Sequence, residues 1–135
     1  MNACYDQKVV FSDPAFGVLE GNEVFAMWEM LASRAKELQV TVSDIHADDT
    51  AGSARWEAQY LFGAHRRPVH NVIKAKFAFR DGKIIEHADS FSMWKWSRMA
   101  IGTIGSLLGW TRFLKSTIQK STRRQLEEYM QKRSA

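Results

Sequence analysis

Two ionisable side chains, His87 and Asp89, are two residues apart in a stretch that reads as a β-strand. Residues i and i+2 of a strand point to the same face of the sheet, so the imidazole and the carboxyl group lie side by side. These are among the groups that enzymes use most often to move protons. The pair therefore predicts acid–base chemistry, provided that the face that carries it is buried and lines a cavity.

The turn at Asp81 and Gly82 decides which face this is. In a two-residue loop, Arg80 lies opposite Lys83, and both faces of the hairpin mix apolar with charged side chains. In a three-residue loop, Gly82 takes a left-handed bulge position and the two faces separate. We predict the second register, which places His87 and Asp89 on the buried face. It pairs Phe79 with Lys83, Phe77 with Ile85, Ala75 with His87, Ile73 with Asp89, Asn71 with Phe91 and Lys76 with Glu86.

Further polar side chains are predicted on the same buried face. Alternation along the strands places six residues on this face among apolar neighbours: Asp13, Trp56, Tyr60, Asn71, His87 and Asp89. A buried ionisable group needs a partner, a water or a ligand, because leaving it unpaired is costly. Two interpretations remain open: a small-molecule cavity with a few convergent polar groups, or a core network in which these groups satisfy one another. The size of the set favours the cavity.

The elements that position these residues follow from hydrophobic periodicity. Alternation predicts half-buried antiparallel strands, and a helical stripe predicts a helix that begins near Asn22 and buries Phe25, Trp28, Leu31, Ala35 and Leu38. The expected order is a strand at 8–13, a helix at 22–38, strands at 40–46, 54–63, 69–80 and 83–93, and one or two helices over 97–133. This pattern predicts a single α+β domain over residues 1–135.

Composition excludes several classes of protein. The chain carries a net charge of +4, and residues 112–133 hold seven basic residues against Glu127 and Glu128, which is typical of a solvated helix face. We expect no nucleic-acid partner and no membrane partner, because no nucleic-acid motif and no bilayer-length apolar run is present. One cysteine and the absence of a signal peptide predict a cytoplasmic protein. The histidines show no metal spacing and no cofactor motif is present, so neither a metal nor a cofactor is expected.

The motifs, taken in order, resemble a known family. VVFSDPAFGVLEG, the WxAxYxF strand, RPVHNxIxAxFxFRDGKI and HxDxFxxW together resemble the SnoaL-like members of the nuclear transport factor 2-like superfamily, over nearly the whole chain. The resemblance implies a strongly curved antiparallel sheet wrapped by helices into a cone with a ligand pocket, and commonly a homodimer. Members usually begin with helices that cap the cone. Here that element is expected to be shortened or missing, and the apolar 99–110 segment or a second subunit to replace it.

The resemblance also implies a set of functions. Ketosteroid isomerases, polyketide cyclases, hydratases and non-catalytic binding modules share this fold, so the expected function is cofactor-free proton transfer on a small apolar carbonyl compound, or binding or dimerisation without turnover. Asp13 matches the base of the isomerases and Asp89 the acid–base residue of the cyclases, whereas the oxyanion-hole Asp of the isomerases matches Ala75. The predicted catalytic residues are Asp89, His87 and Asp13, and the predicted substrate-binding residues are Tyr60, Asn71, Trp56, Phe91 and Trp28.

Overall fold

The computed structural model describes residues 2–34, 37–63, 65–108 and 111–134. Its elements are η1 (Asn2–Cys4), β1 (Tyr5–Asp13), β2 (Gly17–Glu20), α1 (Asn22–Arg34), β3 (Gln39–Ala47), β4 (Ala51–Phe62), β5 (Arg67–Arg80), β6 (Lys83–Ser90), α2 (Met93–Ile101), α3 (Thr103–Leu108) and α4 (Arg112–Ser134). The predicted α+β class is confirmed. The short strand β2 was not predicted, and the C-terminal part forms three helices instead of one or two.

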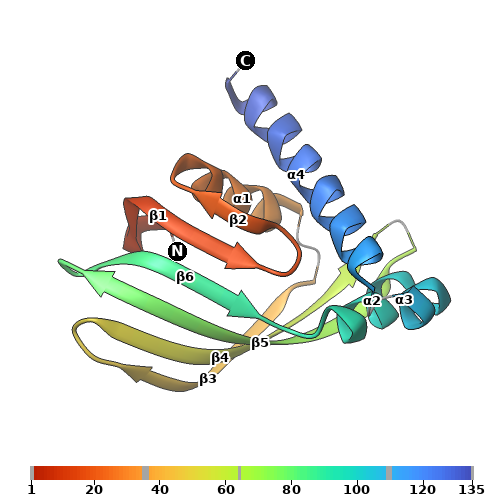
Figure 1. Cartoon of the computed structure of the whole chain (residues 1–135), viewed down its shortest axis with the longest axis horizontal. Helices are drawn as coiled ribbons and strands as arrows, with labels where there is room; N and C mark the ends of the chain where they lie inside the picture. Colours follow the sequence, from red (N-terminus) through yellow and green to blue (C-terminus); the bar gives the residue numbers. More distant parts are fainter. Residues whose placement is uncertain (1, 35–36, 64, 109–110, 135) are drawn as a thin grey trace.

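The six strands form one curved, open sheet in the order β2-β1-β6-β5-β4-β3 (Figure 1). Every neighbouring pair is antiparallel except β1 and β6, which run parallel. This parallel pair joins the start of the chain to its sixth strand and places Phe11 beside His87. The candidate residues on β1 and β6 are therefore neighbours in space although they are far apart in the sequence.

The predicted turn of the β5–β6 hairpin is wrong. Asp81 and Gly82 have φ angles of 52° and 75°, which is the backbone of a two-residue hairpin loop, and Arg80 lies opposite Lys83. The register shifts one pair further on, where Phe79 lies opposite Ile84 but Ala78 opposite Glu86. The extra residue of a bulge is thus inserted into β6 beyond the turn.

This bulge separates the faces as the prediction required, but with a different register. His87 lies opposite Phe77 and Asp89 opposite Ala75, so the predicted partners of Phe77 and Ala75 are displaced by two residues, and the pairing ends at Lys74 and Ser90, before Ile73 and Asn71. Lys76 lies opposite Ala88 and not opposite Glu86. A displacement of two leaves every side chain on its predicted face, and His87 and Asp89 are buried as expected.

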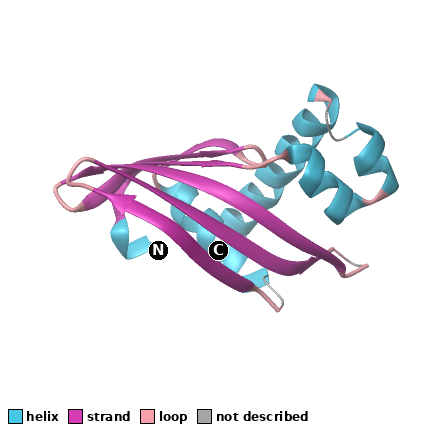
Figure 2. Cartoon of the chain, turned by 90° about the horizontal axis from the view of Figure 1, so that it is seen from below, coloured by secondary structure: helices cyan, strands magenta, loops and turns pink. Residues whose placement is uncertain are grey.

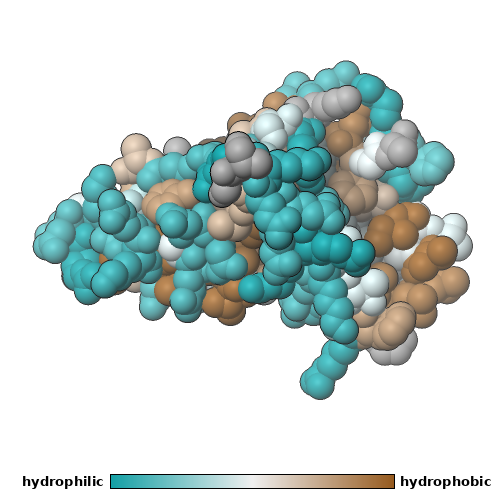
Figure 3. All heavy atoms as spheres, turned by 90° about the horizontal axis from the view of Figure 1, so that it is seen from above, coloured by the Kyte–Doolittle hydropathy of each residue, from teal (hydrophilic) through white to brown (hydrophobic). Residues whose placement is uncertain are grey.

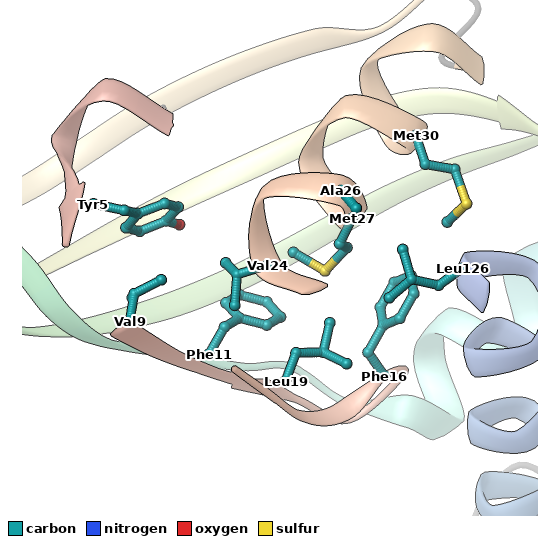
Figure 4. Packing of buried hydrophobic residues seen from close by; sticks show 10 residues of the cluster. All are labelled: Tyr5, Val9, Phe11, Phe16, Leu19, Val24, Ala26, Met27, Met30 and Leu126. Carbon is teal, nitrogen blue, oxygen red and sulfur yellow. The ribbon is translucent and has the colours of Figure 1, made fainter. Parts of the chain in front are cut away.

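Helix α1 buries the predicted stripe only in part: Phe25 and Trp28 are half-buried against the core, and other residues of the helix are buried more deeply. Its buried residues are Val24, Ala26, Met27 and Met30, whereas Leu31 is 39% exposed. The helix ends at Arg34, so Leu38 follows it as part of the connection to β3, and Ala35 lies outside the described residues. The reason is that α1 packs on β1 and β2 and also meets Leu126 of α4, as the cluster in Figure 4 shows.

Helix α4 is fastened to the β1–β2 hairpin by polar contacts as well as by Leu126. Thr122 Oγ1 donates to the Ala15 carbonyl at 2.7 Å, and Arg123 Nη1 donates to the Val18 carbonyl at 2.9 Å. Near its end, Arg133 pairs with Glu29 of α1. Part of the basic charge of this helix is therefore used to hold it on the domain.

A second core lies between α2 and β5. It consists of Val69, Met93, Trp96 and Ala100, with Phe91 and Tyr60 packed against it. Trp96 thus packs the C-terminal helices on the sheet, whereas Trp94 is 36% exposed and Trp110 lies outside the described residues.

The inner face of the sheet, defined as the face that α1 covers, is buried along β1 and β5 and exposed at the edge strand β3. On β1 and β5 it buries Val9, Phe11, Val69, Ile73 and Ala75. On the edge strand β3 the same face carries Val40 and Val42, which are 51% and 52% exposed and lie opposite Ala58 and Trp56. Figure 2 looks onto the outer face, where the strands lie in front of α1 and α4. An apolar strip therefore leads from the β3 edge toward the interior.

Candidate functional site

A line of hydrogen bonds runs through the interior and has His87 at its centre. His87 Nδ1 lies 2.6 Å from the Tyr5 hydroxyl, and His87 Nε2 lies 2.7 Å from Asp89 Oδ1. Trp28 Nε1 donates to the same Tyr5 hydroxyl at 2.9 Å. His87 is 1% exposed and Asp89 7%, so the line is closed off from bulk water. The two residues that first indicated proton chemistry are thus hydrogen-bonded to each other.

The hydrogen-bond donors along Trp28, Tyr5, His87 and Asp89 determine where the protons between them lie. An indole N–H can only donate, so the Tyr5 oxygen accepts from Trp28 and keeps its own proton for His87 Nδ1. Burial raises the pKa of Tyr5 well above its ordinary value, which keeps the phenol protonated. With Nδ1 accepting from Tyr5, a single proton lies between His87 Nε2 and Asp89 Oδ1. Tyr5 therefore sets the orientation of the imidazole toward Asp89.

Aromatic rings enclose the imidazole on several sides. The Phe77 ring centroid is 4.5 Å from that of His87, Phe11 stands edge-on at 5.1 Å, and Trp28 stacks parallel to it at 6.1 Å. On the other side of Trp28, the Trp56 ring is 6.5 Å away. Such surroundings exclude water and strengthen each hydrogen bond inside them.

A second carboxyl group, that of Asp13, lies close to this line. The parallel register of β1 and β6 pairs Ser12 with Ala88, so Asp13 comes next to Asp89. Asp13 Oδ1 accepts from the amides of Ala15 and Phe16 at 2.9 and 2.6 Å, an Asx turn before β2. Burial raises the pKa of Asp13 to about 6 against the lowering effect of the Phe16 amide, and the Asp89 carboxylate raises it further. Asp13 therefore exchanges its proton near neutral pH.

Tyr60 is held in the same way as Tyr5 but keeps its proton free. Trp96 Nε1 donates to the Tyr60 hydroxyl at 2.9 Å, which is the one hydrogen bond of this hydroxyl among the residues that the structure describes. Burial raises the pKa of Tyr60, and Asp13 nearby raises it further. Because its oxygen already accepts from an indole, the phenol can donate its own proton to an oxygen atom of a bound ligand.

The remaining predicted residues divide into two groups. Trp28 and Trp56 belong to the aromatic enclosure of His87, and Asn71 is 6% exposed on the same face of β5. Phe91 packs against the α2 core instead. Tyr5 was missed, because the strand was predicted to begin at residue 8 and an irregularity of β1 between Tyr5 and Val10 interrupts the alternation that Val9, Phe11 and Asp13 follow.

Two hollows in the surface flank this site without reaching its carboxyl groups. One, of about 740 Å³, is lined by Asn2, Tyr5, Gln7, Lys8, Gly21, Asn22 and Phe25. The other, of about 320 Å³, is lined by Tyr60, Val69 and Met99 together with residues of β3, β4 and β5. Neither hollow is lined by Asp13, His87 or Asp89. Of the two interpretations, the hydrogen-bonded network describes His87 and Asp89, which Tyr5 joins, and Asp13 and Tyr60 lie near this network.

Comparison with known proteins identifies the family. The SnoaL-like domain family matches residues 1–87, and the chain belongs to this family. No curated protein sequence matches the chain.

Solved structures show the same fold. One is a protein from Jannaschia sp. CCS1 assigned as a SnoaL-like polyketide cyclase, with 14% identity and a TM-score of 0.64 over 76% of each chain. Another is an epoxide hydrolase from M. tuberculosis, with 18% identity and a TM-score of 0.61 over 79% of each chain. A Catenulispora acidiphila protein with a ketosteroid isomerase-like fold has 13% identity and a TM-score of 0.62 over 73% of this chain and 77% of its own.

Proposed function

We propose that this SnoaL-like protein is a cofactor-free enzyme that moves a proton on a small, mostly apolar carbonyl compound. The observation that supports this most directly is the buried Tyr5–His87–Asp89 line, with the Asp13 carboxyl group beside it. Two neighbouring carboxyl groups of which one titrates near neutrality are suited to take a proton from one atom and return it to another.

Each group then has a definite task. The Asp13 carboxylate takes a proton from the carbon next to the carbonyl group, and its Oδ1 is already held by two amides, so the reacting oxygen is oriented. The Tyr60 hydroxyl donates a hydrogen bond to the enolate oxygen that forms. Asp89, joined to His87 by one shared proton, returns a proton to the product carbon or leaving oxygen. The proton that Asp13 has taken then passes, directly or through water, to Asp89, which restores both groups for the next turnover. No external cofactor is needed for this proton balance.

The surroundings restrict the class of substrate. Trp28 and Trp56 form an apolar wall beside His87, and the exposed strip of Val40 and Val42 continues it to the edge of the sheet. An apolar ring or chain can approach along this strip, whereas a charged substrate would lose its hydration there. We therefore infer a substrate with one polarised oxygen on a hydrocarbon body.

The test is the exchange of protons for solvent deuterium. A panel of cyclic ketones and enones is incubated with the protein in D₂O, and deuterium at the carbon next to the carbonyl is followed by NMR. We expect exchange above the buffer rate for compounds that also raise the unfolding temperature. Asp89→Asn and Asp13→Asn should each slow this exchange by at least about 100-fold, the usual size of a lost acid or base.

The matched control is Asp81→Asn. Asp81 is exposed in the hairpin turn at positive φ, a backbone conformation that asparagine adopts readily. The Asp81→Asn variant should therefore exchange protons at the rate of the wild type. Ligands that stabilise the wild type without any exchange would contradict the enzyme proposal and support the alternative, a binding module without turnover. Equal rates for Asp89→Asn and Asp81→Asn would exclude Asp89 from the reaction.

A smaller effect is expected for Tyr60→Phe. Removing the hydroxyl removes the donor to the substrate oxygen but leaves the ring in the core with Val69 and Trp96. We expect the exchange rate to fall by about 10- to 100-fold, somewhat less than for a full oxyanion-hole donor, with the ligand-induced rise in unfolding temperature nearly unchanged. An unaltered exchange rate would show that Tyr60 does not contact the reacting oxygen.

A further inference from the structure

A large apolar surface lies at the end of the molecule opposite to the turn that joins β5 to β6. We call it the α3 corner, and it consists of Trp94, Ile101, Ile104, Leu107, Leu108 and Phe113. Ile104, Leu107 and Phe113 are 60%, 67% and 75% exposed. Figure 3 shows hydrophobic side chains gathered at the right-hand end of the molecule, where α2 and α3 lie in Figure 1. No helix of the described residues is long and apolar enough to span a membrane.

The fold holds this surface outward. Trp94 Nε1 donates to the Ser106 carbonyl at 2.9 Å and ties α3 to α2. Gly105 lies directly against the Ser97 backbone, where a Cβ atom has no room. Arg67 of β5 donates to the Met99 carbonyl at 2.9 Å and fastens the end of α2 to the sheet. Because the Gly105 side of α3 faces α2, the side with Ile104, Leu107 and Leu108 faces outward.

The sequence segment that contains this corner carries charge of one sign. From Ser90 to Leu126 the sequence has no aspartate or glutamate, but it has seven basic residues: Lys95, Arg98, Arg112, Lys115, Lys120, Arg123 and Arg124. This segment therefore carries +7, and the rest of the chain, with a total of +4, carries −3. Arg98 lies 4.7 Å from the Trp94 ring centroid, so charge and aromatic surface adjoin each other. Arg112 and Lys115 flank the exposed Phe113 in the sequence. Apolar side chains with basic neighbours are complementary to a surface that is apolar inside and anionic outside.

We propose that the α3 corner docks on the surface of an anionic lipid bilayer. Ile104, Leu107 and Phe113 enter the boundary between headgroups and acyl chains, and Arg112 and Lys115 contact the lipid phosphates. This revises the expectation, drawn from the absence of a long apolar run, that no membrane is a partner. Surface docking needs only a short apolar face and basic neighbours. The inference does not depend on the proposed enzyme function.

A second copy of the chain fits this surface less well. A two-fold contact would place the α3 corner of each copy against the other. Arg98 lies on Trp94, and Arg112 and Lys115 flank Phe113 in the sequence, so the contact would bring these like charges of the two copies together. An anionic bilayer instead neutralises the same charges. We therefore assign the corner to a lipid surface and treat self-association as an outcome of the test.

The experiment is co-sedimentation of the full chain with lipid vesicles. We expect binding to vesicles of phosphatidylglycerol mixed with phosphatidylcholine, weak binding to phosphatidylcholine alone, and loss of binding as ionic strength rises. The double variant Ile104→Ser/Leu107→Ser should bind at least about ten-fold more weakly. Arg112→Gln and Lys115→Gln should each weaken binding about five-fold, since each basic residue near an anionic surface contributes by that factor.

The control is Val40→Ser/Val42→Ser, which removes two apolar side chains of similar exposure from the β3 edge, outside the basic segment. It should bind vesicles like the wild type. Light scattering of the same samples measures self-association, and circular dichroism shows that each variant is folded. The proposal is overturned if the wild type does not bind anionic vesicles, or if the control loses as much binding as the α3 variant. A dimer that Ile104→Ser/Leu107→Ser disperses, without vesicle binding, would assign the corner to a second copy instead.

Discussion

Replacing His87 with leucine is expected to lower the free energy of unfolding by about 3 to 5 kcal/mol, the usual cost of leaving a buried charged group without its partner. Leucine fills much of the space that Phe11, Phe77 and Trp28 enclose, so the loss comes from polar groups and not from a cavity. The Asp89 carboxyl group and the Tyr5 hydroxyl group each lose their hydrogen-bond partner on the imidazole. Urea unfolding followed by tryptophan fluorescence measures the difference.

Two further variants make this prediction specific. His70→Leu removes an exposed imidazole that pairs with Glu57 at 3.0 Å, and such a surface pair should cost at most about 1 kcal/mol. Adding Asp89→Leu to His87→Leu removes the stranded carboxyl group and should restore part of the lost stability. If His87→Leu costs no more than His70→Leu, the buried line contributes nothing to folding. A double variant less stable than His87→Leu would place the cost in packing.

The stability contributed by Asp13 is expected to fall as pH rises. Its pKa is about 6 in the folded protein against 3.8 for the free side chain, so the folded state binds the proton more tightly than the unfolded chain does. This contribution is fully present below pH 3.8 and is lost as pH rises through 6. Relative to Asp13→Asn, which has no titrating group, the wild type should lose about 2 to 3 kcal/mol across that window.

The measurement compares unfolding free energies of the wild type and Asp13→Asn at several pH values across the window. Asp89 and His87 lie near Asp13 in both proteins, so the difference between the two isolates the effect of the Asp13 carboxyl group. Asp81→Asn should keep a constant difference from the wild type, since that side chain is exposed. A difference for Asp13→Asn that stays flat with pH would mean that Asp13 is solvated in the folded state.

The same carboxyl group links stability to the proposed reaction. Asp13 acts as a base only when it is ionised, so the exchange rate should rise through pH 6, where the stability contributed by Asp13 falls. Burial thus costs folding free energy at neutral pH and makes the carboxylate a stronger base than an exposed one. Buried titrating groups that weaken a fold are characteristic of functional sites.

Local patterns in the sequence were sufficient to predict which face of a strand is buried, because the two-residue alternation of side chains determines this. Alternation along β4, β5 and β6 placed Trp56, Tyr60, Asn71, His87 and Asp89 on the face that the structure buries or half-buries. The predicted buried face of β5 and β6 is correct although the predicted turn is wrong. The observed register differs from the predicted one by two residues, and the side-chain period of a strand is also two. The motifs identified the family for the same reason, since they consist mainly of these alternating positions.

Contacts between distant segments were beyond such patterns. The bulge in β6 satisfies the twist and pairing of the sheet as a whole, so the residues near the turn do not reveal it. Helix α1 buries Val24 and Met27 more deeply than Phe25 and Trp28 of the predicted stripe, because Leu126 of α4 packs in the same core. Tyr5 reaches His87 across 82 residues of chain, through a parallel pairing of β1 and β6 that no local signal announces.

The sequence by itself determined the α+β class, the family and the presence of an imidazole and two carboxyl groups on one buried face. Each of these depends on residue type and on spacing within one element. Only the tertiary structure decided that Tyr5 and Trp28 orient His87 toward Asp89, that Asp13 titrates near neutrality, and that the apolar α3 corner faces outward. Distances, burial and charge environment arise when separate elements pack, and they are properties of the folded chain.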